Sequence, residues 1–269
     1  MTDKLPDSLP LTFLDAAPAD GGAAGDAVPL LVLHGLFGSA RNWLQYTRLW
    51  GQKRPTYALD LRNHGASPWA DTMSYREMAG DVARFLDDRG IDRAVVLGHS
   101  MGGKAAMTLA LTRPERVERL IVVDIAPVAY THTFAPYVAA MKAADLSGVT
   151  RRSQADGMLA DGVPNPILRA FLMQNLEQAE TGMRWRVNLD AIAACMGDLI
   201  GFPDDLGNAR YGGPTLFIGG ATSDYITAAY EGEIHRRFTD AAVEMIPGAG
   251  HWVHAEKPDP FRALVDRLL

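Results

Sequence analysis

Residues 94–103, with the sequence AVVLGHSMGG, decide how this chain folds. The apolar run 94–97 predicts a buried strand, and the stretch 104–113 before Pro114 predicts a helix. A strand that passes through Gly-x-Ser-x-Gly into a helix is typical of the nucleophile elbow, a tight turn that holds a serine above the end of a sheet strand. We therefore predict that Ser100 is a nucleophile, against the alternative of an unreactive glycine-rich turn.

The same alternation of short apolar runs and amphipathic stretches continues on both sides of this turn. Several runs are unbroken and bounded by Gly or Pro, which favours strands of a parallel sheet that is covered on both faces. A further short strand is expected near residues 11–14, followed by a Gly-rich surface loop at 18–28. The pattern predicts a parallel α/β sheet. The six runs are Leu30–Leu33, Thr56–Leu59, Ala94–Leu97, Leu120–Val123, Thr215–Ile218 and Val243–Ile246.

The alternation stops between about residues 128 and 213. This segment holds many apolar side chains but no clear strand, so it predicts a helical insertion between the fourth and fifth of the six runs. We expect a core formed by residues 1–127 and 214–269, with residues 128–213 as a helical cap.

Composition excludes several classes of protein. The 269 residues are 48% hydrophobic and 22% charged, as in an ordinary globular protein and unlike a disordered chain. The net charge of -6 disfavours a nucleic-acid surface or an anionic membrane surface. The one cysteine, Cys195, allows no intrachain disulfide, fits a reducing compartment and is expected to pack as a small apolar residue. Because we find neither a secretory signal nor a membrane span, we expect a cytoplasmic protein.

A second glycine-rich stretch, His34–Gly38, directly follows the first of the six runs. Its glycines allow a backbone N–H, that of Leu36, to approach the serine. Together with the N–H of Met101 at the start of the helix after the elbow, it would form an oxyanion hole. An ordinary strand-to-helix turn is the alternative.

Seven histidines compete for the role of catalytic base. We favour His251, because a loop between the last strand and the last helix can carry its imidazole back over the serine. His254 is expected to be a surface or packing residue, and His99 to point into the structure. His34 is a candidate to support the oxyanion loop.

The acid that orients His251 has two candidates. Asp124 follows the run 120–123, and Asp224 follows the run 215–218. Both lie past the carboxyl ends of predicted parallel strands, where the sites of such sheets gather. Either one preserves the chain order Ser, Asp, His, so the residues alone leave the choice open.

From about residue 28 to its end, the chain resembles the α/β-hydrolase superfamily, and more narrowly the bacterial short esterases related to α/β-hydrolase-domain protein eleven. Six blocks carry the resemblance in order: His34–Ser39 with Asn42-Trp43, Asp60–Ser67, Gly98–Lys104, Asp124–Val128, Trp185–Leu189 and Gly250–Pro258.

The resemblance implies an eight-stranded, mostly parallel sheet with a helical cap inserted after strand six. It also implies hydrolysis of carboxylic esters or acyl thioesters. Some members of the subgroup take the triad acid from the Asp-Ile-Ala-Pro position, which favours Asp124 over Asp224 here, with Asp190 as an outsider.

The expected reaction is acyl transfer from a small-molecule ester or acyl-CoA-type thioester to water, with no metal and no cofactor. We expect the cap to form an apolar acyl pocket, although for single cap side chains plain packing is favoured. Arg184 and Arg186 are interpreted as a solvated face rather than a site for a CoA phosphate. The alternatives are a carbon–carbon bond hydrolase, a lactonase or a perhydrolase that uses the same triad, and a non-catalytic binding protein of this fold.

Overall fold

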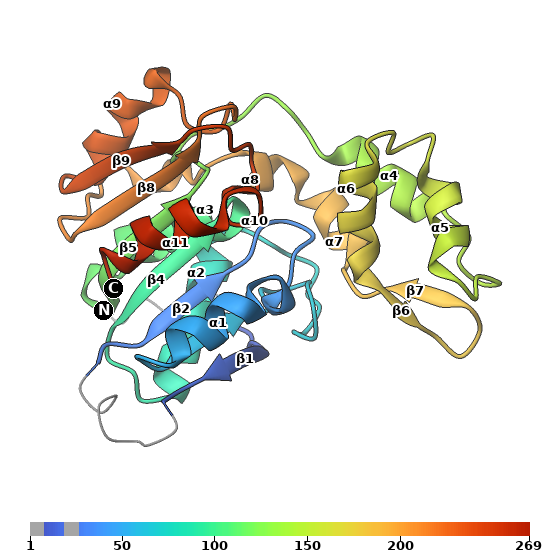
Figure 1. Ribbon diagram of the computed structural model, residues 1–269, viewed down its shortest axis with the longest axis horizontal. Helices are drawn as coiled ribbons and strands as arrows, with labels where there is room; N and C mark the ends of the chain where they lie inside the picture. The colour runs from blue at the N-terminus through green and yellow to red at the C-terminus, as the bar shows by residue number, and fades with distance from the viewer. Residues whose placement is uncertain (1–7, 19–26) are drawn as a thin grey trace.

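The core of the molecule is a twisted sheet with the strand order β1-β3-β2-β4-β5-β8-β9 (Figure 1). The computed structural model describes residues 8–18 and 27–269, so most of the predicted loop at 18–28 lies outside the described residues. β1 is antiparallel to β3, and every other pairing in this sheet is parallel. The strands are β1 (Phe13–Ala16), β2 (Leu30–Leu33), β3 (Thr56–Leu59), β4 (Ala94–His99), β5 (Val117–Val123), β8 (Thr215–Gly220) and β9 (Ala241–Ile246).

All six apolar runs become strands of this sheet, and the N-terminal strand is β1, so the predicted α/β sheet is confirmed. The expected count of eight is corrected, because the sheet has seven strands within the described residues. The insertion accordingly follows β5, the fifth strand along the chain, and not a sixth. The eighth strand came from the resemblance and has no apolar run of its own in this sequence.

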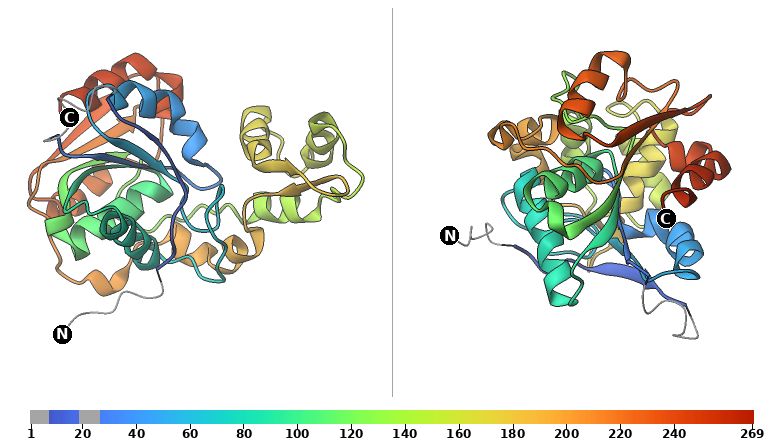
Figure 2. Two further views of the ribbon diagram at one scale, coloured as in Figure 1. Left: turned by 90° about the horizontal axis from the view of Figure 1, so that it is seen from below. Right: turned by 90° about the vertical axis from the view of Figure 1, so that its left-hand side faces the viewer.

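Helices cover both faces of the sheet (Figures 1 and 2). Successive strand residues point to opposite faces, so Leu31 and Leu33 enter one core cluster while Leu30 and Val32 enter the other. The first cluster packs under α2 (Tyr75–Asp88), α3 (Met101–Thr112) and α9 (Ala228–Arg237). The second packs under α1 (Leu44–Gly51) and α11 (Pro258–Asp266). This double cover explains why the strands are apolar on both sides.

The predicted helix boundaries are set by local chemistry. The Ser74 hydroxyl accepts from the Glu77 N–H, and the Glu77 carboxylate accepts from the Ser74 N–H at 2.8 Å, which caps α2. Pro114 follows the end of α3, and Pro258 occupies the first turn of α11.

Across the part of the chain that the structure describes, no helix is long and apolar enough to cross a membrane.

The segment between β5 and β8 forms a lobe beside the sheet (Figures 1 and 2). It contains a feature that the sequence analysis missed, the antiparallel pair β6 (Leu176–Gln178) and β7 (Met183–Trp185). Three-residue strands are too short to show an alternating pattern. The helices of the segment are α4 (Ala135–Ala143), α5 (Arg152–Leu159), α6 (Pro166–Leu172), α7 (Leu189–Ala194) and α8 (Met196–Ile200), with one 3-10 turn at Met173–Asn175 and another at Asp204–Leu206.

The last helix of this segment, α8, is bound to core side chains. The Tyr75 hydroxyl donates to the carbonyl oxygen of Leu199 at 2.6 Å, and the Lys104 ammonium donates to that of Ile200 at 3.0 Å. Part of the segment 128–213 is therefore fixed to the core, and the division into core (1–127 and 214–269) and cap (128–213) stays a prediction.

Candidate active site

Ser100 occupies a strained turn between β4 and α3. Its backbone angles are φ 52° and ψ -118°, a region that side-chain-bearing residues rarely adopt. The Ser100 N–H donates to the carbonyl oxygen of Val123 at 3.0 Å and ties the turn to the next strand. A Cβ atom on Gly98 would lie 2.2 Å from the Gly102 carbonyl oxygen, and one on Gly102 would lie 2.4 Å from the Leu33 carbonyl oxygen. The glycines on both sides of the serine are thus required by close packing.

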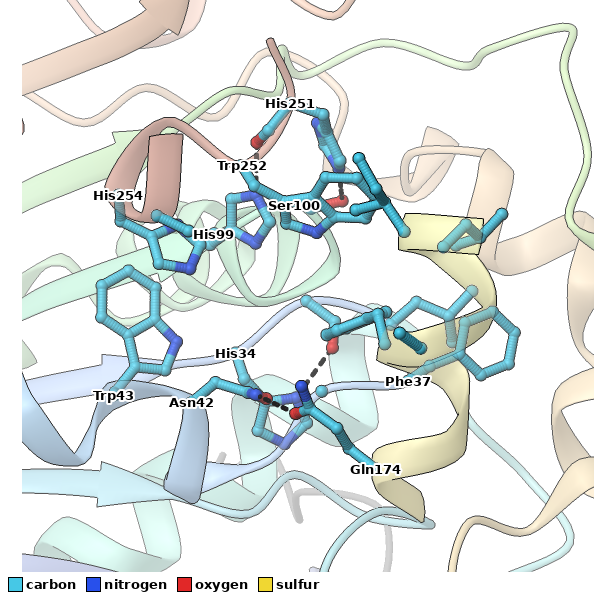
Figure 3. A pocket seen from close by; sticks show the side chains of 18 of the residues that line it. His34, Phe37, Asn42, Trp43, His99, Ser100, Gln174, His251, Trp252 and His254 are labelled. Atoms are coloured by element: carbon cyan, nitrogen blue, oxygen red, sulfur yellow. Dashed lines mark hydrogen bonds between the residues drawn. The ribbon is translucent and has the colours of Figure 1, made fainter. Parts of the chain in front are cut away.

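Ser100, His251 and Asp124 form a continuous chain of hydrogen bonds. Ser100 Oγ lies 3.1 Å from His251 Nε2, and His251 Nδ1 lies 2.8 Å from Asp124 Oδ2 (Figure 3 shows the first contact). The three residues follow the carboxyl ends of β4, β9 and β5. Parallel strands end at the same edge of the sheet, which brings together residues that are far apart in the sequence.

The partners of His251 determine where its proton lies. A carboxylate oxygen only accepts, so Nδ1 carries the proton that is donated to Asp124. Nε2 is then the unprotonated nitrogen and accepts the hydroxyl proton of Ser100. This is the arrangement that a general base needs beside a serine nucleophile.

Asp124 is fully buried and held from three sides. Its Oδ1 accepts from the Gly220 N–H at 2.9 Å, and its Oδ2 accepts from the Ser223 hydroxyl at 2.5 Å in addition to His251. Its backbone φ is 49°, a left-handed value that aspartate tolerates better than most residues.

The other two acid candidates lie elsewhere. Asp224 follows β8 as expected, but its side chain is exposed, and His251 Nδ1 takes Asp124 as its partner instead. Asp190 is exposed in α7 and forms an ion pair with Lys142 at 2.5 Å. The structure therefore brings Asp124 alone of the three to the imidazole.

The loop His34–Gly38 lies beside Ser100, and Leu36, Met101 and Ser100 line a common cavity. Two buried histidines fix this loop. His34 Nδ1–H donates to the Gly35 carbonyl oxygen at 2.8 Å and its Nε2 accepts from the Leu61 N–H at 3.0 Å. His64 Nε2 accepts from the N–H of Phe37, a residue with φ 61°. Burial lowers the pKa of His34 to about 4 and that of His64 to about 3, which keeps both rings neutral.

Two more buried histidines support the loop of His251. His99 Nε2–H donates to the His251 carbonyl oxygen at 2.9 Å, and burial holds the pKa of His99 well below its usual value. His254 stacks on Trp43, with ring centroids 4.3 Å apart, and burial lowers its pKa to about 3. His254 is thus a packing residue, the second of the two roles expected for it.

A tyrosine covers the face of the His251 ring. The rings of Tyr225 and His251 are stacked, and the Tyr225 hydroxyl lies 2.7 Å from Nε2 of His132. Burial and the charge of Asp124 raise the pKa of Tyr225, so its hydroxyl keeps its proton and donates. Tyr225 and Ser223 were absent from the predicted site, because a ring stack and a contact between loops leave no periodic signal in the sequence.

A cleft of about 830 Å³ opens from Ser100 between the core and α6 (Figure 3). The volume lies within the range of small-molecule sites. Hydrogen bonds connect the core side of the cleft to the turn that follows α6. Asn42 Nδ2 donates to Gln174 Oε1 at 2.8 Å, and Asn175 Nδ2 donates to the Phe37 carbonyl oxygen at 2.8 Å. Among its lining residues are Leu36, Phe37, Phe134, Ile167, Leu168, Phe171 and Trp252.

The chain is similar to known proteins over most of its length. A family model described as the alpha/beta hydrolase fold matches residues 28–258. The chain is 43% identical over 268 residues to the sn-1-specific diacylglycerol lipase ABHD11 of Xenopus tropicalis, and the match covers 97% of this chain and 83% of that relative. It is 34% identical over 242 residues to the esterase YbfF of Escherichia coli (strain K12), with 90% of this chain and 92% of that relative covered.

The solved structures include a similar protein called a marine microorganism esterase. It superposes with a TM-score of 0.91 at 36% sequence identity. The superposition covers 97% of this chain and 100% of that one, so the likeness includes the lobe beside the sheet as well as the sheet itself.

Proposed function

Because the chain belongs to the α/β-hydrolase fold family, we propose that it is a serine ester hydrolase whose catalytic triad is Ser100, His251 and Asp124. Relatives named as an esterase and a diacylglycerol lipase support ester hydrolysis. The observation that carries the proposal is the chain of hydrogen bonds from Ser100 Oγ to Asp124, which leaves His251 Nε2 free to take the serine proton. The substrate is a small-molecule carboxylic ester or an acyl thioester.

In the first half of the reaction, Ser100 Oγ attacks the carbonyl carbon while His251 Nε2 accepts its proton. The negative charge of Asp124 stabilises the imidazolium that forms and keeps the ring in place. The N–H groups of Leu36 and Met101 are proposed to bind the oxyanion of the tetrahedral intermediate. His251 then protonates the leaving alcohol or thiol, and the acyl group stays on Ser100.

In the second half, His251 takes a proton from a water molecule that attacks the acyl-enzyme. The acid is released and Ser100 recovers its proton from the imidazolium. His99 contributes by holding the main chain of His251 at its carbonyl oxygen, so the ring returns to the same position in each half of the cycle.

Hydrolysis of a series of p-nitrophenyl esters from acetyl to palmitoyl tests the proposal, with the Ser100→Ala variant measured beside the wild type. We expect turnover by the wild type and none above the uncatalysed rate by the variant. Acyl-CoA thioesters are then assayed in the same way to separate thioesterase from esterase activity. Equal turnover by the variant and the wild type, or none by the wild type on any ester or thioester, would contradict the proposal.

A further inference from the structure

Ser100 lies between two cavities of very different size. The large cleft has a volume of about 830 Å³, and the second cavity has room of about 20 Å³, enough for one group the size of a water molecule or a methyl group. Leu36, Ser100 and Phe134 line both of them. The small cavity is further lined by Tyr75, Met101, Lys104, Ile125, Tyr130, His132, Leu199, Ile200 and Tyr225.

The position of His251 decides which part of an ester enters which cavity. His251 must protonate the leaving oxygen, and it lines the large cleft together with Trp252. In the tetrahedral intermediate, one bond joins Ser100 Oγ, the oxyanion turns to its N–H donors, and the leaving oxygen turns to His251. The acyl substituent takes the remaining direction. The small cavity offers the space for it, because Ser100 lines both cavities while His251 is in the described lining of the large cleft and not in that of the small cavity.

We propose that the small cavity is the acyl pocket and that it limits the enzyme to short acyl groups, acetyl above all, on large apolar leaving groups. The inference rests on the proposed function and adds the substrate class to it. The acetyl group passes to Ser100 Oγ, the alcohol or thiol leaves with the proton from His251, and water then releases acetate. The apolar side chains of α6 thus bind the leaving group and not the acyl chain that the sequence led us to expect there.

The chemistry of the small cavity favours a methyl group over a polar or charged acyl group. Lys104 Nζ already donates to the carbonyl oxygens of Ile200 and Gly201 and lies 4.8 Å from the ring centre of Tyr130. The Tyr75 hydroxyl donates to the Leu199 carbonyl oxygen. These polar groups therefore already have partners.

The hydroxyl of Tyr130, which also lines the small cavity, has hydrogen-bond partners as well. The Tyr130 hydroxyl accepts from the Ala126 N–H at 2.8 Å and donates to the Tyr225 carbonyl oxygen at 2.6 Å. The Tyr225 hydroxyl and His132 Nε2, which also line the cavity, are bonded to each other. The apolar side chains of the lining include those of Leu36, Met101, Ile125, Phe134 and Leu199.

The large cleft has the size and the lining for a bulky leaving group. Ile167 of α6 is exposed over 69% of its surface and lines the cleft, so its apolar side chain is available to a ligand. Phe171 of α6 lies next to Trp252 of the core, with ring centroids 5.7 Å apart, and both line the cleft. Leaving groups with several methylenes would bury apolar surface here at little cost to the protein.

Two isomeric esters separate the acyl side from the leaving-group side. Hexyl acetate and ethyl hexanoate have the same composition and nearly the same hydrophobicity, but they place the long chain on opposite sides of the ester bond. We expect kcat/KM for hexyl acetate to exceed that for ethyl hexanoate by about tenfold or more, since each methylene that a pocket rejects is worth about tenfold. Equal rates, or a preference for ethyl hexanoate, would overturn the acyl-pocket assignment.

A failure of the proposed function gives a different result. In that case the wild type hydrolyses neither isomer, or the Ser100→Ala variant hydrolyses both as fast as the wild type does. A wild type that needs Ser100 but prefers ethyl hexanoate would leave the triad in place and overturn only the acyl pocket.

Enlarging the small cavity provides the second test. Leu199→Ala removes a lining side chain and keeps the main-chain oxygen that Tyr75 binds. We expect it to raise kcat/KM for ethyl hexanoate relative to hexyl acetate by about tenfold. The matched control is Leu146→Ala, which truncates a leucine of the same 7% exposure outside the described lining of both cavities, and should keep the wild-type ratio.

Thermal unfolding of both variants shows whether each is folded at the assay temperature. If Leu199→Ala does not fold, Ile125→Val enlarges the same cavity by one methylene, and the same ratio is expected to rise by a smaller factor. An unchanged ratio in a folded Leu199→Ala or Ile125→Val protein overturns the proposal.

Discussion

The imidazole ring of His251 stacks on the phenol ring of Tyr225, with the ring centroids 4.1 Å apart and the ring planes 25° apart. Tyr225 is held at both ends, since its hydroxyl donates to His132 and its main-chain oxygen accepts from the Tyr130 hydroxyl. An aromatic face attracts a cation, and His251 becomes a cation each time it takes the proton of Ser100. Tyr225 is therefore placed to stabilise the charged form of the base as well as to orient it.

We expect Tyr225→Leu to lower kcat by up to about tenfold, because a cation above an aromatic ring is stabilised by about 1 kcal/mol. Tyr225→Phe keeps the ring and should retain most of the wild-type kcat. Steady-state kinetics on one p-nitrophenyl ester distinguish the two variants. A loss in the phenylalanine variant as large as in the leucine variant would assign the effect to the hydroxyl bond with His132 and not to the stack.

Measuring kcat of two variants distinguishes Asp124 from Asp224 as the residue that orients His251. Asp124→Asn replaces the acceptor for His251 Nδ1–H by an amide, and we expect kcat to fall by on the order of 10⁴. Asp224 is exposed, and Asp224→Asn should stay within about twofold of the wild type. Thermal unfolding of both variants controls for loss of structure, because Asp124 also binds Gly220. The reverse order of the two losses would make Asp224 the acid.

The hydroxyl of Ser223 is the second donor to the Asp124 oxygen that faces His251. Hydrogen bonds to charged groups contribute about 1.5–3 kcal/mol, so we expect Ser223→Ala to reduce kcat by about 10- to 150-fold, far less than Asp124→Asn. Ser223→Thr keeps the hydroxyl and should recover most of the rate. If Ser223→Ala has the wild-type kcat, the hydroxyl does not contribute to the orientation of Asp124.

The strand pattern and the elbow could be predicted because each is determined by residues that are adjacent in the sequence. Gly98 and Gly102 are required by contacts that any such turn makes, and the apolar runs are unbroken because helices cover both faces of the sheet. The acid could not be chosen in this way. Asp124 and Asp224 both follow strands. The difference between them is that Asp124 accepts from the N–H of Gly220, at the end of β8, and from the hydroxyl of Ser223, in the loop after β8.

The free energy of unfolding at acid pH is expected to depend on His34, His64 and His254, three buried histidines near the candidate active site. Burial lowers the pKa of His34 to about 4 and the pKa values of His64 and His254 to about 3, against 6.5 for an unperturbed histidine. Between pH 6.5 and pH 4 the unfolded chain therefore binds protons at these rings and the folded protein does not. The free energy of unfolding must fall as the pH falls through this window, by about 1.4 kcal/mol per pH unit for each ring.

Removing one of these rings should flatten that dependence. His254→Phe keeps an aromatic ring against Trp43 but cannot bind a proton, so the slope of unfolding free energy against pH should decrease by about 1.4 kcal/mol per pH unit. Met158→Leu, at an exposed site in α5, changes no titratable group, so it is the control and should keep the wild-type slope. Urea unfolding at pH 6, 5 and 4 measures all three proteins. Equal slopes for His254→Phe and the wild type would mean that His254 binds its proton in the folded protein as readily as in the unfolded chain.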